Sequence, residues 1–243
     1  MDYIDIFIKN NYINLKQIAE SGQCFRWKKM CPGRYFVISD GRAACFFQEK
    51  TGIRILCREK DEEYFRRYLD LDIDYGKVIE QIDEKDDFLI GAAQMGRGIR
   101  ILRQNLWEMI ISFIISQRNN IPRIMKSIDA LCEKLGEQIV FDYEGEHLVG
   151  YTFPSPEVIV GADLSEFKFG YREKYIRQTA ENILEGKFDL EEVKDAVDEG
   201  KTSEQVKEML KQLKGVGEKV ASCIQLFGLH QLELFPIDTW IAK

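Results

Sequence analysis

The segment from Leu106 to Gln117, LWEMIISFIISQ, constrains the fold more than any other part of the chain. Its apolar residues cover almost every side of a helix rather than a single stripe. A helix that is apolar all round has to be surrounded by protein, and this one is shorter than the roughly 18 apolar residues that cross a membrane. The sequence therefore predicts a buried central helix in a domain of packed helices.

The region before residue 60 has a different pattern, which is that of a β-sheet. Turn sequences at Pro32-Gly33, Asp40-Gly41 and Thr51-Gly52 separate short runs that are rich in β-branched and aromatic residues. These runs are FRWKKM, RYFVISD, AACFFQE and IRILCRE. Turns spaced about ten residues apart favour an antiparallel meander. After Asp61 the apolar residues recur at helical spacing, so helices should flank the sheet.

From about Gln94 to the end, the pattern is almost wholly α-helical. Asn120 and Pro122 suit an N-cap and a first helical turn, and further helices are predicted at 171–184, 203–213 and 217–227. The predicted fold class is therefore α+β. An antiparallel β-sheet domain with flanking helices is expected over residues 1–93, followed by a helical domain over residues 94–243 without a flexible linker.

The charge distribution leaves nucleic acid open as a partner. The net charge of −7 argues against a protein that simply coats nucleic acid, but affinity for DNA depends on local phosphate contacts. Residues 96–126 carry basic side chains against a single acid, Glu108. A solvated helix face and a DNA-binding face both fit this stripe. Its basic members are Arg97, Arg100, Arg103, Arg118, Arg123 and Lys126.

The cysteines and the start of the chain indicate a cytoplasmic protein, associated with the nucleoid if it is bacterial. The six cysteines form no CxxC pair and have no zinc spacing, so they are expected to be reduced and buried. The first residues, MDYIDIFIKNNYINL, lack the basic start of a signal peptide. No membrane partner is expected, because no apolar run is long enough to span a bilayer.

The sharpest local motif is Leu213-Lys214-Gly215-Val216-Gly217-Glu218-Lys219. A helix ends at its start, two glycines form a tight turn and a new helix begins at once. Glycine lets the backbone adopt positive φ and lets another chain approach closely. The first amides of the new helix lack partners and form a phosphate site. This is the physics of a helix-hairpin-helix that grips a DNA backbone, although an ordinary glycine-capped turn has the same pattern.

Lys219 lies in the first turn of the new helix, where the helix dipole disfavours a cation. A lysine there is either simply solvated or held, partly desolvated, as the neutral amine that nucleophilic attack requires. About twenty residues later, Pro236-Ile237-Asp238 places an acid at the opening of another helix, which alone is a capping pattern. Together, the hairpin, Lys219 and Asp238 resemble the signature of the helix-hairpin-helix glycosylase superfamily, and this resemblance implies that the two residues are a nucleophile and its carboxylate partner.

Four further segments complete a resemblance. They are SGQCFRW at 21–27, GRGIRILRQ at 96–104, SQRNNIPRI at 116–124 and FGYR at 169–172. With the hairpin and Asp238, they resemble, in the same order, the motifs of 8-oxoguanine DNA glycosylase/AP lyases of the helix-hairpin-helix superfamily. The resemblance implies a twisted N-terminal antiparallel sheet and an all-α helix-hairpin-helix glycosylase domain. It also implies base-excision repair of double-stranded DNA that contains oxidised guanine, and a monomer is expected.

The resemblance further implies the chemistry of the site. Lys219 would attack C1′ of a flipped nucleotide, expel the base and hold the sugar as a Schiff base, which then permits β-elimination. Asp238 would stabilise positive charge that develops on the sugar. The Gly22 carbonyl would accept the N7 hydrogen that oxidised guanine has and guanine lacks, which discriminates between the two bases. The other implied residues of the base pocket are Phe25, Cys223 and Pro236.

A set of DNA contacts follows from the same resemblance. Tyr171 would insert into the base stack, while Arg123 and Arg172 would hydrogen-bond the orphaned cytosine. The hairpin amides would hold a phosphate. The implied DNA-binding residues are Arg118, Asn119, Arg123, Tyr171, Arg172, Gly215 and Gly217. No cofactor is implied, apart from a structural monovalent cation on the backbone carbonyls of Leu213 and Val216.

The chain departs from the family's pattern in three places. Arg118 stands where the family has the first asparagine of its turn, so cytosine specificity is expected to be relaxed or achieved differently. Trp240 stands where many members have a phosphate-contacting histidine. The family continues well beyond Lys243, so the helical domain is expected to be C-terminally incomplete. The sequence is then either a fragment or a truncated member with an open base pocket.

Two other functions remain open from the sequence. One is a helix-hairpin-helix glycosylase of other lesion specificity, although alkyladenine glycosylases generally lack the hairpin lysine and adenine glycosylases lack the SGQCFRW segment. The other is a non-catalytic helix-hairpin-helix DNA-binding protein. Such a protein would bind DNA with strong salt dependence but would form no covalent intermediate.

Overall fold

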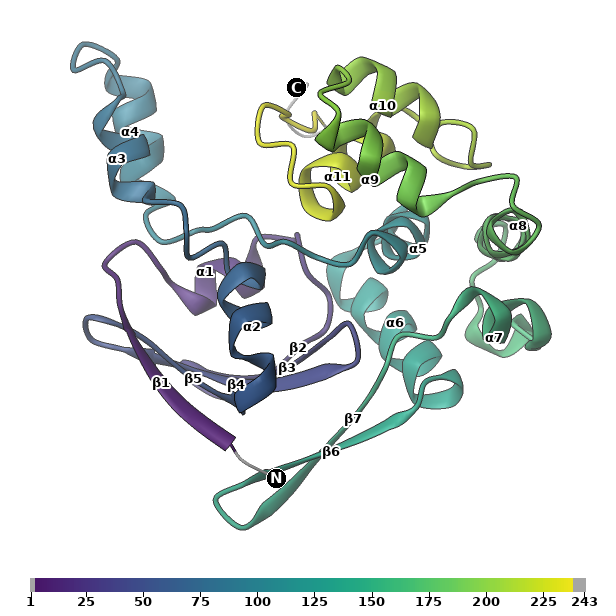
Figure 1. The fold of residues 1–243 in the computed structure, drawn as a ribbon, viewed down its shortest axis with the longest axis horizontal. Coiled ribbons are helices and arrows are strands. Elements are labelled where there is room, and N and C mark those ends of the chain that lie inside the picture. Colours follow the sequence, from purple (N-terminus) through teal and green to yellow (C-terminus); the bar gives the residue numbers. More distant parts are fainter. Residues whose placement is uncertain (1–2, 238–243) are drawn as a thin grey trace. The chain divides into compact units, whose positions relative to one another are not determined.

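The computed structural model describes residues 3–237, and the chain divides into two compact units. The first unit contains the residues up to 38, 42–103 and 140–148. The second unit contains residues 39–41, 104–139 and those from 149 onward. A five-stranded sheet forms the centre of the first unit, and the second unit is built from helices (Figure 1). The predicted α+β class is confirmed.

The sheet of the first unit is antiparallel and has the strand order β1-β5-β4-β3-β2. The four runs predicted from the sequence are its last four strands along the chain, and they form the expected meander. The strands are β1 (Tyr3–Lys9), β2 (Trp27–Cys31), β3 (Arg34–Ser39), β4 (Arg42–Glu49) and β5 (Gly52–Arg58).

Strand β1 is missing from the sequence-based prediction. Its apolar residues alternate, and Ile4 and Ile8 pack against the core, which is the pattern of a half-buried edge strand. It pairs antiparallel with β5, which comes some fifty residues later along the chain. Gly52 makes this pairing fit, because a Cβ there would overlap the Ile8 carbonyl oxygen and its φ is +157°.

Helices flank this sheet, as expected. They are α1 (Leu15–Glu20), the short 3-10 helix η1 (Glu59–Asp61), α2 (Glu62–Tyr68), α3 (Tyr75–Glu80) and α4 (Asp87–Met95). Trp27 is central to the core of the unit. Its ring lies 5.2 Å from the ring of Phe46, and its Nε1 donates to the Tyr68 hydroxyl at 2.9 Å. Trp27 is therefore a core residue of the sheet.

The six cysteines are free thiols, and five of them are buried, whereas Cys31 is exposed. Burial raises the pKa of the Cys45 and Cys57 thiols to about 12, from an ordinary value of 9.0. The expected burial is thus confirmed for five of the thiols and is wrong for Cys31. Both raised pKa values have a consequence for stability.

We expect the free energy of unfolding to fall as the pH rises from about 9 to 12. In the unfolded chain these two thiols lose their protons near pH 9, whereas the folded protein keeps them to about 12. The stability they contribute is therefore complete below pH 9 and is lost above it, with a slope of up to about 1.4 kcal/mol per pH unit for each thiol. Urea denaturation at pH 8 and pH 10.5 measures the loss. The fall in the free energy of unfolding between these pH values should be smaller in Cys45→Ala and unchanged in Cys31→Ala, whose thiol is exposed. An equal fall in the wild type and both variants would contradict the assignment.

The basic stripe predicted over residues 96–126 is not one surface. Arg100 is fully buried, Arg103 donates from Nε to the Asp70 carboxylate at 2.8 Å, and the guanidinium of Arg97 lies 4.9 Å from the centre of the Tyr12 ring. The contacts of all three arginines are with residues of the first unit. Of the six basic side chains, those of Arg118, Arg123 and Lys126 remain exposed on the second unit.

The second unit confirms the predicted central helix. Its helices are α5 (Leu106–Ser116), α6 (Ile121–Leu135), α7 (Pro156–Gly161), the 3-10 helix η2 (Ser165–Phe167), α8 (Arg172–Leu184), α9 (Leu190–Asp198), α10 (Ser203–Leu210) and α11 (Glu218–Gly228). Every residue of α5 from Leu106 to Ile115 is buried. Asn120 caps α6 as predicted, because its side chain accepts from the Arg123 amide at 3.0 Å. None of the helices within residues 3–237 is both long and apolar enough to cross a membrane.

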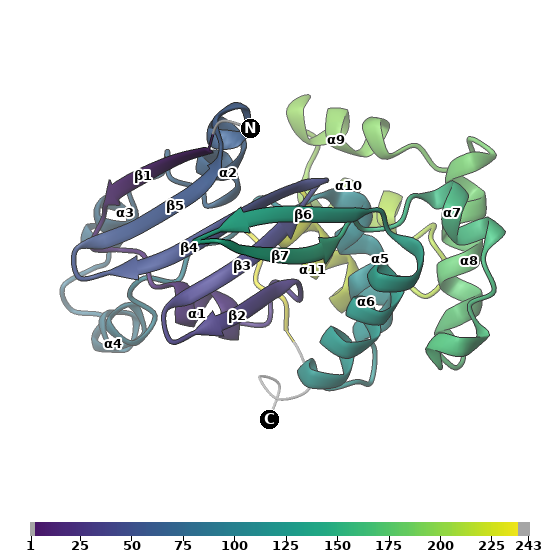
Figure 2. The same ribbon diagram turned by 90° about the horizontal axis from the view of Figure 1, so that it is seen from below.

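Strands β6 (Gln138–Tyr143) and β7 (Glu146–Tyr151) form a hairpin in a region whose sequence pattern predicts helices (Figure 2). Its turn, Glu144-Gly145, has φ of +50° and +83°, as a tight hairpin turn requires. The tip of the hairpin belongs to the first unit, where the Phe141 ring lies 4.8 Å from that of Tyr3. Helices α7 and α9 are also absent from the prediction, so the expected helical pattern was incomplete here.

Candidate active site and DNA-binding hairpin

The predicted hairpin is formed by α10, the turn at 211–217 and α11 (Figure 1). A reciprocal capping box starts α10, since the Thr202 side chain accepts from the Gln205 amide and the Gln205 side chain accepts from the Thr202 amide. Leu213 and Val216 are 1% and 5% exposed, and the Val216 amide donates to the Leu213 carbonyl at 3.0 Å. Buried side chains and main-chain bonds therefore fix the turn.

The two glycines of the turn differ in what requires them. Gly215 has a φ of +89°, and a Cβ there would lie 2.8 Å from Cγ of Tyr175. Gly217 has a φ of −98°, which any residue adopts, and a Cβ there would meet nothing within 4 Å. The fold of the unit itself thus demands glycine at 215. At 217 no contact among residues 3–237 demands it, and the bare backbone leaves room for an external group.

The first turn of α11 offers free amide donors. Gly217 is the N-cap and has no side chain that could accept from these amides. Within the described part of the chain, no acceptor is found for the amides of Gly217, Glu218 and Lys219. Amides at a helix start, together with the helix dipole, favour a phosphate. The hairpin therefore has the donors of the predicted phosphate site.

Lys219 is the second residue of α11 and is exposed. Cys223 lies one turn later on the same side of the helix and is 4% exposed. Val220 and Ile224 are buried, which holds the helix in place. The expected partial desolvation of Lys219 is not found, because solvent reaches its side chain. Among residues 3–237, no group buries this amine.

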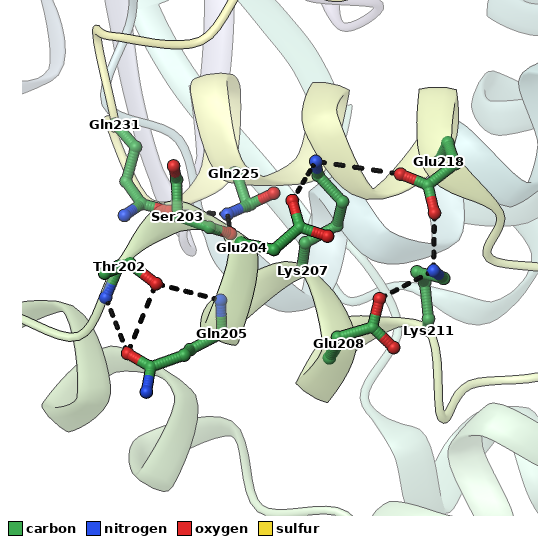
Figure 3. A network of polar contacts seen from close by, with 10 residues as sticks. All are labelled: Thr202, Ser203, Glu204, Gln205, Lys207, Glu208, Lys211, Glu218, Gln225 and Gln231. Atoms are coloured by element: carbon green, nitrogen blue, oxygen red, sulfur yellow. Dashed lines mark hydrogen bonds and ion pairs between the residues drawn. The ribbon is translucent and has the colours of Figure 1, made fainter.

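Glu218, the first residue of α11, ties the two helices of the hairpin together (Figure 3). Its carboxylate pairs with Lys211 and, at 3.6 Å, with Lys207. Lys207 lies in α10, and Lys211 is the C-cap of that helix. Each lysine also pairs with an acid of its own segment, Glu204 at 2.8 Å for Lys207 and Glu208 at 2.7 Å for Lys211. The Lys211 ammonium holds the pKa of the Glu218 carboxyl below its ordinary value. We call Lys207, Lys211 and Glu218 the clasp.

We expect Lys211→Met to weaken DNA binding several-fold, because it leaves the Glu218 carboxylate less neutralised beside the phosphate-binding amides. Fluorescence anisotropy with duplex DNA over a series of salt concentrations measures this. The double variant Lys211→Met/Glu218→Gln should recover most of the lost affinity. If the double variant binds as weakly as Lys211→Met, Lys211 contacts phosphate directly and the clasp does not explain the loss.

The turn at 117–119 is held by Arg172. The Nε of Arg172 donates to the Gln117 carbonyl at 2.9 Å, and its Nη2 donates to the same carbonyl and, at 3.3 Å, to that of Arg118. Arg118 has a φ of +46°, which is uncommon for a residue with a side chain and marks a strained position. Asn119 donates from Nδ2 to the Ile115 carbonyl at 3.3 Å. The turn thus presents the exposed Arg118 side chain on a fixed backbone.

The predicted contact of Arg172 with an orphaned base stays a prediction. Besides its bonds to the turn, its Nη1 donates to the Phe169 carbonyl at 3.1 Å. A guanidinium has five N–H groups in all. Four of these N–H groups therefore donate to main-chain carbonyls. A contact with a base requires the remaining Nη1 hydrogen or a rearrangement of the side chain. Arg123 is exposed at the start of α6, and its side chain makes no hydrogen bond or ion pair within residues 3–237.

The loop that is predicted to read the lesion lies in the first unit. Gly22 has a φ of +80°, and its carbonyl has no donor within residues 3–237. Its neighbour Gln23 is 1% exposed; its Nε2 donates to the Arg100 carbonyl at 2.9 Å and its Oε1 accepts from the Leu102 amide at 2.8 Å. Gln23 therefore fixes the loop that carries Gly22. The sequence motif assigns this glutamine no role, although its place beside Gly22 is a signal for one. Phe25 is 4% exposed in the same unit.

Asp238 and Trp240 lie outside the described residues, whereas Pro236 is half-buried in the segment that precedes them. No group of three or more His, Cys, Asp or Glu side chains within residues 3–237 could hold a metal ion. The carbonyls of Leu213 and Val216 are neutral oxygens, which suit a hard monovalent cation rather than a transition metal.

Several known proteins are similar to this chain in sequence and fold. The sequence model of the N-terminal domain of 8-oxoguanine DNA glycosylases matches residues 5–110. The N-glycosylase/DNA lyase of Saccharomyces cerevisiae is 29% identical over 267 residues, which cover 97% of this chain and 68% of that protein. The matches to two further curated relatives cover 62% of their length.

Two solved structures are similar over almost the whole chain. The complex of MBOgg1 with a low-affinity DNA ligand has 33% sequence identity and a TM-score of 0.87, covering 99% of this chain and 84% of that one. The apo-form of Clostridium acetobutylicum 8-oxoguanine glycosylase/lyase has 32% identity and a TM-score of 0.87, covering 99% and 82%. With the hairpin, its lysine and the sheet unit in place, the chain belongs to the 8-oxoguanine DNA glycosylase/lyase family of the helix-hairpin-helix superfamily.

Proposed function

We propose that this chain is a bifunctional DNA glycosylase/AP lyase that removes 8-oxoguanine from duplex DNA. The observation that carries the proposal is the position of Lys219, an exposed amine in the first turn of α11 beside amides that lack acceptors in the described residues. A phosphate held by those amides brings the sugar of a neighbouring nucleotide within reach of the lysine. Membership of the family supports both chemical steps.

The reaction begins with attack of the neutral Lys219 amine on C1′. The C1′–N9 bond breaks with its electron pair going to the base, which takes up a proton and leaves. The nitrogen then loses a proton, and its electron pair forms the C=N bond as the C1′–O4′ bond breaks. O4′ takes up a proton, so the sugar is opened and held by Lys219 as a protonated imine. Removal of a C2′ proton then expels the 3′ phosphate by β-elimination. Asp238 is proposed to stabilise the positive charge on the sugar.

The substrate is proposed to be read by the Gly22 carbonyl. Oxidised guanine carries a hydrogen on N7, which this acceptor can bind, whereas N7 of guanine is itself an acceptor and would be repelled. A carbonyl without a donor in the described residues, on a loop fixed by Gln23, supports this role. We also propose that the protein acts as a monomer in the cytoplasm, where its free thiols stay reduced.

A monovalent cation is proposed to bind the carbonyl oxygens of Leu213 and Val216. It would stiffen the hairpin turn and add positive charge next to the bound phosphate. No chemical step depends on it, because the nucleophile and the lesion reader are residues of the chain.

Borohydride trapping tests the proposed function. A duplex with 8-oxoguanine opposite cytosine is incubated with the protein, and the imine is reduced to a stable covalent adduct. We expect an adduct with this duplex and none with the matched guanine–cytosine duplex. Binding without any adduct would favour a DNA-binding module, and trapping only on another damaged base would favour a different lesion specificity.

A further inference from the structure

The ring of Tyr171 is held from two sides within the second unit. It is 47% exposed, yet the Tyr175 ring meets it edge-on, with centroids 5.8 Å apart at 71°. The Arg172 guanidinium lies 4.7 Å from the centre of the same ring. An exposed aromatic side chain with these two neighbours is restricted in its rotamers before any ligand arrives.

The two neighbours are anchored in different DNA-binding segments. The ring of Tyr175 packs against the backbone of the hairpin at Gly215. A Cβ atom added to Gly215 would lie 2.8 Å from Cγ and 2.9 Å from Cε2 of Tyr175. Arg172 is bonded to the carbonyls of the turn at 117–118. The Tyr171 ring therefore lies between the proposed phosphate grip and that turn. A movement of the hairpin would be transmitted to the Tyr171 ring through Tyr175, and a movement of the turn through Arg172.

We propose that Tyr175 is a positioning residue that couples the phosphate-binding hairpin to insertion of Tyr171 into the DNA. This inference rests on the proposed function. When the hairpin binds its phosphate, Tyr175 fixes the angle at which Tyr171 enters the base stack. The Tyr171 side chain is then already ordered before the base is extruded, so the entropy cost of ordering it is not added to the extrusion step.

The ring of Tyr175, and not its hydroxyl, performs this task. The structure gives this hydroxyl no hydrogen bond within residues 3–237, whereas the ring makes both the contact with Tyr171 and that with Gly215. Tyr175→Phe should therefore behave as the wild type. Tyr175→Leu keeps the apolar volume on α8 but loses the edge-on ring contact.

Comparison of two substrates tests the inference. In single-turnover reactions, Tyr175→Leu should slow excision of 8-oxoguanine by about three- to tenfold, the range expected for an aromatic pair. Borohydride trapping on a duplex with a preformed abasic site should stay within about twofold of wild type, because no base has to be extruded there. Leu184→Ala, at the exposed far end of the same helix, serves as the control for loss of apolar surface and should change neither rate.

The outcomes separate this inference from the proposed function. Wild-type protein that excises no 8-oxoguanine would contradict both. If the wild type excises the base and Tyr175→Leu slows both substrates equally, Tyr175 is merely structural and the inference is wrong. It is also wrong if Tyr175→Phe is as slow as Tyr175→Leu, or if Tyr175→Leu has no effect. A slow Tyr175→Leu that keeps the abasic rate and is matched by a normal Tyr175→Phe supports the coupling.

Discussion

Replacing Lys219 by glutamine is expected to abolish the covalent adduct and to lower excision of 8-oxoguanine by about a thousandfold or more. Glutamine has similar length but its amide nitrogen is not a nucleophile. Lys219 is exposed and its side chain has no ion pair within residues 3–237, so the loss should come without loss of folding. Single-turnover excision and borohydride trapping on the 8-oxoguanine duplex measure the effect.

Lys214→Gln is the matched control for this prediction. Lys214 is exposed in the turn of the same hairpin, and the substitution removes the same charge. It should weaken binding modestly, in a salt-dependent way, while leaving trapping at saturating protein unchanged. Equal loss of trapping in both variants would mean that the charge of the hairpin matters and that Lys219 has no chemical role of its own.

Arg100→Met is expected to lower the free energy of unfolding by about 3–5 kcal/mol, the largest effect on stability that we predict. Arg100 is fully buried and lies 4.1 Å from the centre of the Tyr75 ring. Its Nε donates to the Leu69 carbonyl at 2.9 Å, and its Nη2 donates to the carbonyls of Asp70 and, at 2.7 Å, Ile73. Methionine removes these side-chain donors. The carbonyls of Leu69 and Ile73 then keep no donor within residues 3–237, whereas that of Asp70 still accepts from the Ile73 amide at 3.4 Å. Urea denaturation followed by circular dichroism measures the loss.

Arg97→Met provides the comparison for Arg100. Arg97 is exposed and stacks on the Tyr12 ring at 4.9 Å, so its replacement should cost less than about 1 kcal/mol. Similar losses in the two variants would show that the buried network is not what stabilises this part of the first unit.

The fold could be predicted from the sequence where local patterns decide it. The all-round apolar character of 106–117, the turn signals of the sheet and the glycines of the hairpin all identify their elements without reference to distant residues. Strand β1 and the β6–β7 hairpin were missed for a physical reason. β1 depends on pairing with a strand some fifty residues away, and the Glu144-Gly145 turn lacks the Asn or Asp that usually marks such hairpins.

The candidate site shows the same limit. Lys219, Gly215 and Gly217 could be singled out because a motif carries them within a few residues. The roles of Gln23, Arg100 and Tyr175 could not, because each depends on a partner that is far away in sequence: the Leu102 amide, the Leu69 carbonyl and the Gly215 backbone. Long-range packing converts such residues from ordinary polar or aromatic side chains into supports of the site.

The central claim, that Lys219 is the nucleophile, is tested most directly by locating the trapped adduct. The protein is trapped with borohydride on the 8-oxoguanine duplex, digested with trypsin and analysed by mass spectrometry. We predict that the sugar remnant is on Lys219, in a peptide that starts at Gly215 and is not cleaved after the modified lysine. An adduct on Lys214, on Lys211 or on the N-terminal amine, with Lys219 unmodified, would contradict the account.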